Sequence, residues 1–128
     1  MGDHERGMRV RREVLGDEHV DRAEAGVDQF TEDFRDFITR YAWGEIWDRP
    51  GLGRRERSLA TLAALIALRD ENEIEMHVRA ALRNGLSPEE IKEVILHTAL
   101  YAGLPAANSA FAIAQGVVAR AREDECSP

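Results

Sequence analysis

Apolar residues recur at every third or fourth position along most of this chain, which is the spacing of helices buried on one face. Between Val27 and Ala42 the repeating apolar residues are Val27, Phe30, Phe34, Phe37, Ile38 and Tyr41. The stretch Arg54–Arg69 is apolar around its whole centre, so we expect it to form the most buried helix. No segment alternates apolar and polar residues as a half-buried strand does. The sequence therefore predicts an all-α fold built as a helical bundle.

Residues that begin and end helices support this prediction. The stretch Glu73–Asn84 is followed by Gly85, which favours a helix end. Ser87-Pro-Glu-Glu90 then predicts a new helix, because the serine can cap it, proline fits its first position and the second glutamate closes a capping box. We expect that helix to end at Gly103 and a last helix to run over 105–122, giving about six helices. The expected inner face of the last helix consists of Ala106, Ala110, Phe111, Ala114 and Val117.

The chain has the size and organisation of one domain. Its 128 residues, 44% of them hydrophobic, are enough to bury a core, and they contain no serine- or glycine-rich linker, no low-complexity tract and no repeat. We therefore expect a single domain over 1–128. Residues 5–15 are charged and weakly helical, so 1–25 is expected to form an N-terminal arm rather than a core element. Residues 43–53 contain both tryptophans, three glycines and a proline, and predict a loop that folds back onto the core.

Charge and cysteine content narrow the function. The formal net charge of −7 opposes generic nucleic-acid binding and association with anionic membranes. Because 16 of the 17 basic residues are arginine, whose planar fork of donors matches carboxylates, a small anionic ligand remains possible. The single Cys126 excludes an intrachain disulfide. The charged N-terminal segment does not resemble a signal peptide, and the longest apolar stretch is too short to span a membrane, so we expect a cytoplasmic protein.

Two pairs of residues are candidates for chemistry. Glu73 and His77 are four residues apart and share a helix face, so they form either a general acid–base pair or an ordinary surface ion pair. His97 and Tyr101 have the same spacing within an apolar run, so they are either core residues with satisfied hydrogen bonds or polar tips on a pocket wall. Glu73, His77 and His97 could supply three zinc ligands, but the usual order of the zinc motif and a cysteine ligand are both missing, so we predict no metal.

Arginines gather around the tryptophan-containing segment and the start of the helix after it. They are Arg40, Arg49, Arg54, Arg55 and Arg57. Like positive charges near a helix N-terminus are mildly unfavourable, unless an anion binds there. The cluster therefore indicates either an anion site or ordinary charges that keep the protein soluble.

Several segments resemble the carboxymuconolactone decarboxylase family. They are ITRYAWGEIWDRPGL at Ile38–Leu52, RSLATLAALIAL at Arg57–Leu68, the stretch Glu73–Asn108 and the early Val10–Arg22. The redox branch of the wider alkylhydroperoxidase-like superfamily carries a Cys-x-x-Cys pair ahead of the histidine that matches His77. Here those two places hold Asp70 and Glu73, so the resemblance does not extend to peroxidase chemistry.

The resemblance implies an all-helical subunit in a homo-oligomer, which we expect to be a trimer or a hexamer. It also implies decarboxylation of 4-carboxymuconolactone to 3-oxoadipate enol-lactone and CO2, in the protocatechuate branch of the β-ketoadipate pathway. We predict that no cofactor is needed, because this substrate carries its own electron acceptor. On this hypothesis His77, oriented by Glu73, donates a proton, while Arg57 and Arg49 bind carboxylates. The residues expected to line the pocket are Glu45, Trp47, His97 and Tyr101.

Two other functions compete with this one. The chain could be a superfamily member with a different activity, such as an alkylhydroperoxidase-like (peroxiredoxin-type) antioxidant protein, or a helical assembly module without catalysis. The missing cysteine pair opposes the first alternative, and the retained tryptophan segment with its arginines opposes the second.

Overall fold

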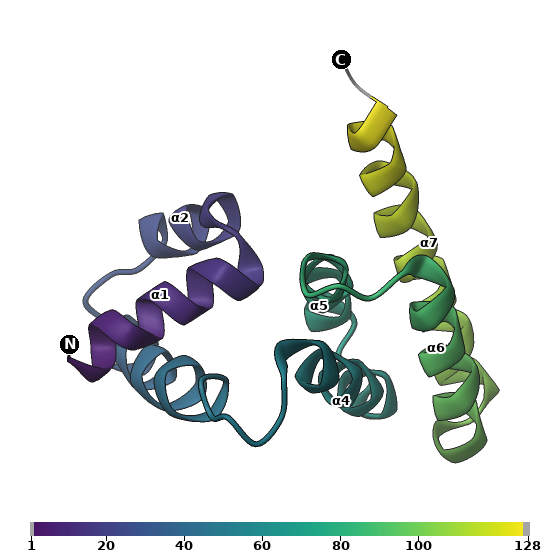
Figure 1. The fold of residues 1–128 in the computed structure, drawn as a ribbon, viewed down its shortest axis with the longest axis horizontal. Helices are drawn as coiled ribbons and strands as arrows, with labels where there is room; N and C mark the ends of the chain where they lie inside the picture. Colours follow the sequence, from purple (N-terminus) through teal and green to yellow (C-terminus); the bar gives the residue numbers. More distant parts are fainter. Residues whose placement is uncertain (1, 127–128) are drawn as a thin grey trace. The chain divides into compact units, whose positions relative to one another are not determined.

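The computed structural model describes residues 2–126, which form seven α-helices and one π-helix and contain no strand (Figure 1). The helices are α1 (Asp3–Leu15), α2 (Asp17–Ala25), α3 (Glu32–Ile38), the π-helix η1 (Thr39–Ile46), α4 (Arg54–Leu68), α5 (Glu71–Arg83), α6 (Pro88–Ala102) and α7 (Leu104–Cys126). The all-α prediction is confirmed, with somewhat more helices than the six expected. None of these helices is both long enough and apolar enough to cross a membrane.

The helices fall into two compact units, Met1–Arg54 and Arg55–Pro128. The first unit contains α1, α2, α3 and η1, and the second contains the helices from α4 onward. Each unit has buried side chains of its own. The single domain expected over 1–128 stays a prediction.

In the first unit, α1 packs closely against η1. A Cβ atom placed on Gly7 would overlap the carbonyl oxygen of Thr39, and one placed on Gly44 would lie 3.0 Å from the carbonyl oxygen of Asp3. Glycine is therefore required where the two backbones meet. Val10 and Val14 are fully buried, so the expectation that 5–15 is an arm outside any core was wrong. A narrow stripe of small and apolar residues is buried on a helix whose other faces are charged.

An ion pair with a buried arginine joins α1 to α2. Arg11 is only 3% exposed, and its Nη1 atom donates a hydrogen bond of 2.6 Å to Oε1 of Glu24. Val20 of α2 is fully buried as well. Because a buried charge must be paired to be tolerated, this bond makes α2 part of the same packed unit.

The tryptophan-containing segment begins as a helix, which corrects the predicted loop over 43–53. The π-helix η1 extends to Ile46, and the backbone N–H of Trp47 donates to the carbonyl of Ala42, five residues earlier, at 2.9 Å. Trp43 is buried, and the rings of Trp43 and Trp47 lie 5.2 Å apart. The prediction that this segment folds back onto a core is confirmed for Trp43.

The aromatic face expected to be buried next to this segment is exposed. α3 begins at Glu32, later than predicted, and Phe30 is 94% exposed. Phe34, Phe37 and Tyr41 are also at least half exposed, although Phe37 and Tyr41 stack on each other at 5.6 Å. Instead, η1 buries Thr39, Trp43 and Gly44, which lie on a different face of the helix.

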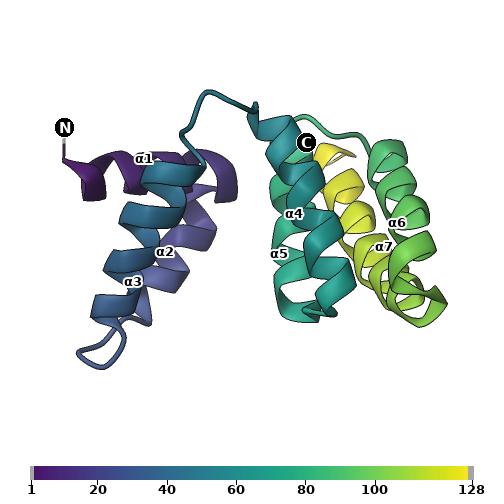
Figure 2. The ribbon, with the colours of Figure 1, turned by 90° about the horizontal axis from the view of Figure 1, so that it is seen from below.

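In the second unit, α4, α5, α6 and α7 lie side by side around a common core (Figure 2). The buried core residues are Leu62, Ile66, Ile74, Val78, Ala81, Leu86, Ile91, Ile95, Ala106, Ala107, Ala110, Ala114 and Val117. The predicted inner face of α7 is confirmed for its alanines and Val117, while Phe111 is partly buried. The prediction that α4 is the most buried helix was wrong. It buries only Ser58, Leu62 and Ile66, whereas α5 buries five residues.

The ends of α6 follow the sequence signals. Ser87 accepts a hydrogen bond from the backbone N–H of Glu90 at 3.1 Å, and the Glu90 side chain accepts one from the backbone N–H of Ser87 at 2.9 Å. This is the predicted capping box. Gly103 ends the helix with φ +95°, a backbone conformation that favours glycine.

Glu90 also holds the start of α4 against the turn between α5 and α6. Both terminal nitrogens of Arg55 bind the carboxylate of Glu90, and Nη1 of Arg55 also donates to the carbonyl of Gly85 at 3.0 Å. The bonds from Arg55, followed by the backbone N–H of Ser87, lower the pKa of Glu90 from 4.5 to about 2.

We expect the Glu90 carboxylate to make folding depend on pH in the acid range. Because its pKa is lower in the folded state, it stabilises the fold above about pH 4.5, and this stabilisation is lost as the pH falls towards about 2. Urea unfolding of wild-type protein should therefore show a steeper loss of stability between these pH values than unfolding of Glu90→Gln. Glu93→Gln, an exposed change on the same helix, should keep the wild-type slope. Parallel pH profiles for wild type and Glu90→Gln would contradict this account.

We also expect Gly7→Ala to destabilise the protein, because the added methyl group meets the backbone of η1. Overpacking of this kind typically lowers the free energy of unfolding by about 1–3 kcal/mol. Gly51→Ala is the matched control, since nothing lies within 4 Å of a Cβ atom there. Urea denaturation of both variants tests this, and equal stability of Gly7→Ala and wild type would show that the helices do not touch at this point.

Candidate active site

The start of α5 places the candidate acid–base pair. Arg69 ends α4 with φ +59°, and Asp70 then caps α5 by accepting a hydrogen bond from the backbone N–H of Glu73 at 3.4 Å. Asp70 was not predicted as a cap, although aspartate followed three residues later by glutamate is a capping pattern. The cap fixes Glu73 in the first turn of the helix and His77 one turn later.

His77 lies at the boundary between the core and the outside of the second unit. Its residue is 8% exposed, and its Nδ1 atom is buried. Its Nε2 atom lies 3.9 Å from Oε2 of Glu73, whose side chain is 48% exposed. This distance is too long for a hydrogen bond but lies within the range of an ion pair. The pair shares a helix face as predicted, and the burial of His77 distinguishes it from an ordinary surface ion pair.

Arg57 belongs to the same unit as this pair. It lies in the first half of α4, is half-buried, and has its Nε atom shielded from solvent. One turn further along, Leu62 packs in the common core with Ile74 and Val78 of α5. The three residues predicted to be catalytic are therefore carried by two helices of one unit.

Three of the five clustered arginines bind carboxylates of the chain itself. Arg40 binds Asp36 at 2.8 Å, Arg54 binds Glu13 at 2.6 Å, and Arg55 binds Glu90. The guanidinium groups of these three arginines are bound by carboxylates of the chain, so the five arginines do not all point to one anion site. The sequence could not reveal this, because Glu13 and Glu90 lie 41 and 35 residues from their partners.

The predicted pocket residues around the tryptophans all lie in the first unit. Glu45 and Arg49 are exposed, and Trp47 is half-buried against Trp43. The backbone N–H of Arg49 donates to the carbonyl of Ile46 at 3.2 Å, which closes the end of η1. The roles of Glu45, Trp47 and Arg49 as substrate contacts stay predictions.

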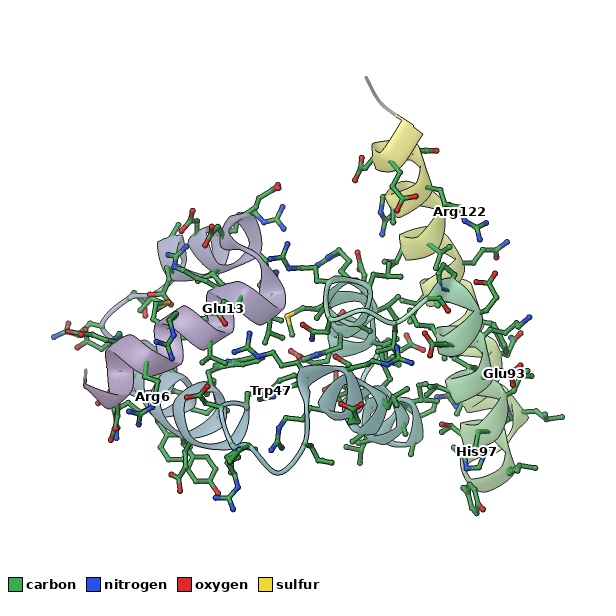
Figure 3. All side chains as sticks on the ribbon, viewed as in Figure 1. Arg6, Glu13, Trp47, Glu93, His97 and Arg122 are labelled. Atoms are coloured by element: carbon green, nitrogen blue, oxygen red, sulfur yellow. The ribbon has the colours of Figure 1, made fainter. Side chains whose placement is uncertain are left out.

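His97 and Tyr101 are not core residues. Both are exposed on α6, Tyr101 by 80%, and their rings lie 5.6 Å apart. His97 lines a groove of about 780 Å³ between α4 and α6, whereas Tyr101 is not among the lining residues. Figure 3 shows His97 and Glu93 projecting from the same helix. The other residues lining the groove are Leu59, Ala63, Glu89, Glu90, Val94, Leu96, Thr98 and Leu100.

The chemistry of this groove does not suit a dicarboxylate. Glu89, Glu90 and Glu93 line one end, where they would repel an anionic substrate. His77 and Arg57 are not among its lining residues. The groove is large, but it is mostly apolar and carries carboxylates at one end. The imidazole of His77 and the guanidinium group of Arg57 are better suited to bind and protonate an anion.

Metal ligands are not clustered in the part of the chain that the structure describes. Within 2–126, no group of three or more histidine, cysteine, aspartate or glutamate side chains is arranged to hold an ion. In particular, His97 lines the α4–α6 groove, and it does not join Glu73 and His77 in such a group.

Comparison with known proteins identifies the family. Residues 32–116 match the model of the carboxymuconolactone decarboxylase family. The chain belongs to this family. It is 52% identical over 120 residues to 4-carboxymuconolactone decarboxylase of Acinetobacter baylyi, an alignment covering 91% of this chain and 90% of that protein. It is also 40% identical to nitrosuccinic acid decarboxylase npaB of Metarhizium robertsii, over 88% of this chain and 78% of that protein.

A shorter match points the same way. A 4-carboxymuconolactone decarboxylase of Pseudomonas putida is 48% identical over 42 residues, which cover 33% of this chain and 88% of that sequence. The family predicted from sequence is therefore confirmed. The matched residues cover α3, η1, α4, α5, α6 and the first half of α7, and they include the Glu73–His77 pair.

Proposed function

We propose that this member of the carboxymuconolactone decarboxylase family converts 4-carboxymuconolactone to 3-oxoadipate enol-lactone and CO2. The observation that carries this proposal is the 52% identity, across nine-tenths of both chains, to a protein named for that reaction. The reaction belongs to the protocatechuate branch of the β-ketoadipate pathway. Among the residues described, a buried histidine beside a carboxylate supplies an acid of the kind the reaction needs.

The proposed reaction needs binding groups and one proton. Cleavage of the bond between the ring γ-carbon and its carboxylate releases CO2 and leaves an electron pair on that carbon. The pair moves through the ring double bond to the lactone carbonyl, which gives a dienolate. Protonation of the α-carbon then yields the enol-lactone. Because the lactone itself accepts the electrons, we propose that no cofactor or metal takes part.

Each catalytic role follows from the position and chemistry of one side chain. His77 donates the proton to the α-carbon, and the Glu73 carboxylate lies 3.9 Å from its Nε2 atom, where it orients the ring. The planar fork of Arg57 binds a substrate carboxylate. His97 and Tyr101 stay predicted substrate contacts, although the glutamates that line the groove beside His97 oppose a dianion there.

The second relative supports the reaction class. Its name specifies decarboxylation of nitrosuccinic acid, which is also a dicarboxylic acid with an electron-accepting group on a carbon that bears a carboxyl group. Two relatives named as decarboxylases favour carbon–carbon cleavage over peroxide reduction or a purely structural role. The places of the two redox cysteines are occupied by Asp70 and Glu73, which cap and charge the start of α5.

Turnover of lactone generated enzymatically in situ tests this function directly. We expect the wild-type protein to release CO2 and to remove the ultraviolet absorbance of the substrate. His77→Ala should lose at least about 100-fold in kcat, since general acid catalysis typically contributes 10²–10⁴. The matched control is His4→Ala, which removes an exposed histidine of α1 and should retain activity. Near-normal turnover by His77→Ala would remove His77 from the mechanism.

Arg57→Lys tests the carboxylate contact in the same assay. The change keeps the positive charge but removes the planar fork, so we expect KM to rise about tenfold with a smaller change in kcat. Arg79→Lys is the control, because Arg79 is an exposed arginine of the same unit that pairs with Glu75. Unchanged kcat and KM in Arg57→Lys would exclude this residue from substrate binding.

We further propose that the chain assembles into a homo-oligomer, with a trimer or a hexamer as the predicted copy number. Large apolar side chains that are at least half exposed support this: Phe30, Phe34, Phe37, Tyr41, Leu52, Leu68, Leu96, Leu100, Tyr101 and Leu104. Exposed apolar area on this scale is typical of contact surfaces. A cytoplasmic location also stays a prediction.

Sedimentation velocity tests the assembly. We expect wild-type protein to sediment as a single oligomer, and Leu100→Glu to shift it towards smaller species, because the change places a charge at an exposed apolar position of α6. Gln115→Glu, at an exposed polar position of α7, should leave the distribution unchanged. A monomeric wild-type protein would contradict the proposal.

A further inference from the structure

A partly buried hydrogen bond joins the two helices that carry the proposed catalytic residues. Asn84, the C-terminal cap residue of α5, donates a hydrogen bond from Nδ2 to Oγ of Ser58 on α4, at 2.9 Å. Ser58 is 1% exposed and Asn84 is half-buried, so the bond lies at the edge of the core of the second unit. Neither residue donates the proton or contacts the carboxylate in the mechanism proposed above.

Each helix that this bond joins carries a proposed catalytic residue. Asn84 is seven residues after His77 and eleven after Glu73, and at about 100° per residue all three fall within about 20° of one face of α5. Ser58 directly follows Arg57 on α4. The hydrogen bond therefore connects the face of α5 that carries the acid to the turn of α4 that carries the guanidinium group.

The contacts elsewhere between α4 and α5 show why this bond matters for alignment. At one end, the helices are joined by the short turn at Arg69 and Asp70. Along their length, Leu62 and Ile66 pack with apolar residues of α5, and such contacts are non-directional. At the other end, two directional contacts set how far α4 lies along α5. Arg55 donates to the carbonyl of Gly85, directly after α5, and Ser58 accepts from Asn84 closer to Arg57 in the sequence.

We propose that Ser58 and Asn84 are positioning residues that hold Arg57 in register with His77 for decarboxylation. The proposal rests on the function proposed above. Arg57 must hold the substrate carboxylate while His77 reaches the α-carbon, so a small slide of one helix along the other separates two groups that act on one molecule. A misplacement of about 1 Å is enough to reduce a rate by up to about 100-fold.

The decisive comparison is between two serine variants of the same unit. Ser58→Ala removes the proposed positioning bond. Ser87→Ala removes a serine bond of the same kind, to the backbone N–H of Glu90, that caps α6 instead. At a temperature where both variants are folded, we expect kcat/KM of Ser58→Ala to fall about tenfold and that of Ser87→Ala to stay near wild type. Ser58→Thr, which keeps the hydroxyl group, should retain activity.

Asn84→Ala removes the same hydrogen bond from the half-buried side. It gives a second route to the result if Ser58→Ala does not fold, and it should show the same loss of kcat/KM. The double variant Ser58→Ala/Asn84→Ala should be no less active than either single variant, because all three lack one shared bond. Losses that multiply in the double variant would overturn the proposal.

An activity-independent readout separates this proposal from the proposed function. The Cε1–Hε1 signal of His77 in NMR spectra should move in Ser58→Ala and stay in place in Ser87→Ala. If wild-type protein does not turn over the lactone, the proposed function fails while this comparison still tests the alignment. Wild-type activity in Ser58→Ala, equal activity losses in both serine variants, or equal movement of the His77 signal would each overturn the positioning role.

Discussion

The burial of one apolar stripe from each of α4, α5, α6 and α7 is the constraint on which the second unit depends. Each fully buried leucine or isoleucine in that core, such as Leu62 or Ile74, contributes about 1.5–3 kcal/mol relative to an exposed side chain. The stripe of α5 places His77 directly beside Val78, so the same packing that stabilises the helix buries the imidazole. The proposed proton donor and the core residues of α5 therefore lie next to each other, so we expect substitutions in the core near α5 to affect activity as well as stability.

Helix ends in the second unit could be predicted from sequence because their signals are local. Ser87 and Glu90 are three residues apart and satisfy each other's backbone groups, whatever the rest of the fold does. The packing of the first unit could not be predicted in this way. The glycine contact that makes α1 a core helix joins Gly7 to Gly44, and nothing near Gly7 in the sequence identifies its partner. Apolar spacing also predicts an amphipathic face without showing whether the same chain covers it, as Phe30 demonstrates.

In the candidate site, too, local features could be predicted from the sequence and long-range contacts could not. The spacing of Glu73 and His77 was sufficient to predict that they share a face, because four residues on a helix determine it. The burial of His77 depends on the surrounding helices, and the spacing of residues on α5 does not specify those helices. The Ser58–Asn84 bond spans 26 residues and involves two residue types that are common at helix surfaces and ends, so no sequence pattern marked it. Likewise, the sequence could not predict that Arg54 binds Glu13 and that Arg55 binds Glu90, because the partners lie far apart in the chain.

The two candidate binding regions of the second unit, the α4–α6 groove and the surroundings of Arg57 and His77, differ in charge. The groove between α4 and α6 is apolar with carboxylates at one end, whereas Arg57 and His77 can carry positive charge. A crystal structure with a non-reactive dicarboxylate lactone bound tests the account most directly. The account predicts a carboxylate within hydrogen-bond distance of the Arg57 guanidinium group and the ring α-carbon facing the His77 imidazole. A lactone bound among Glu89, Glu93 and His97, away from Arg57, would contradict it.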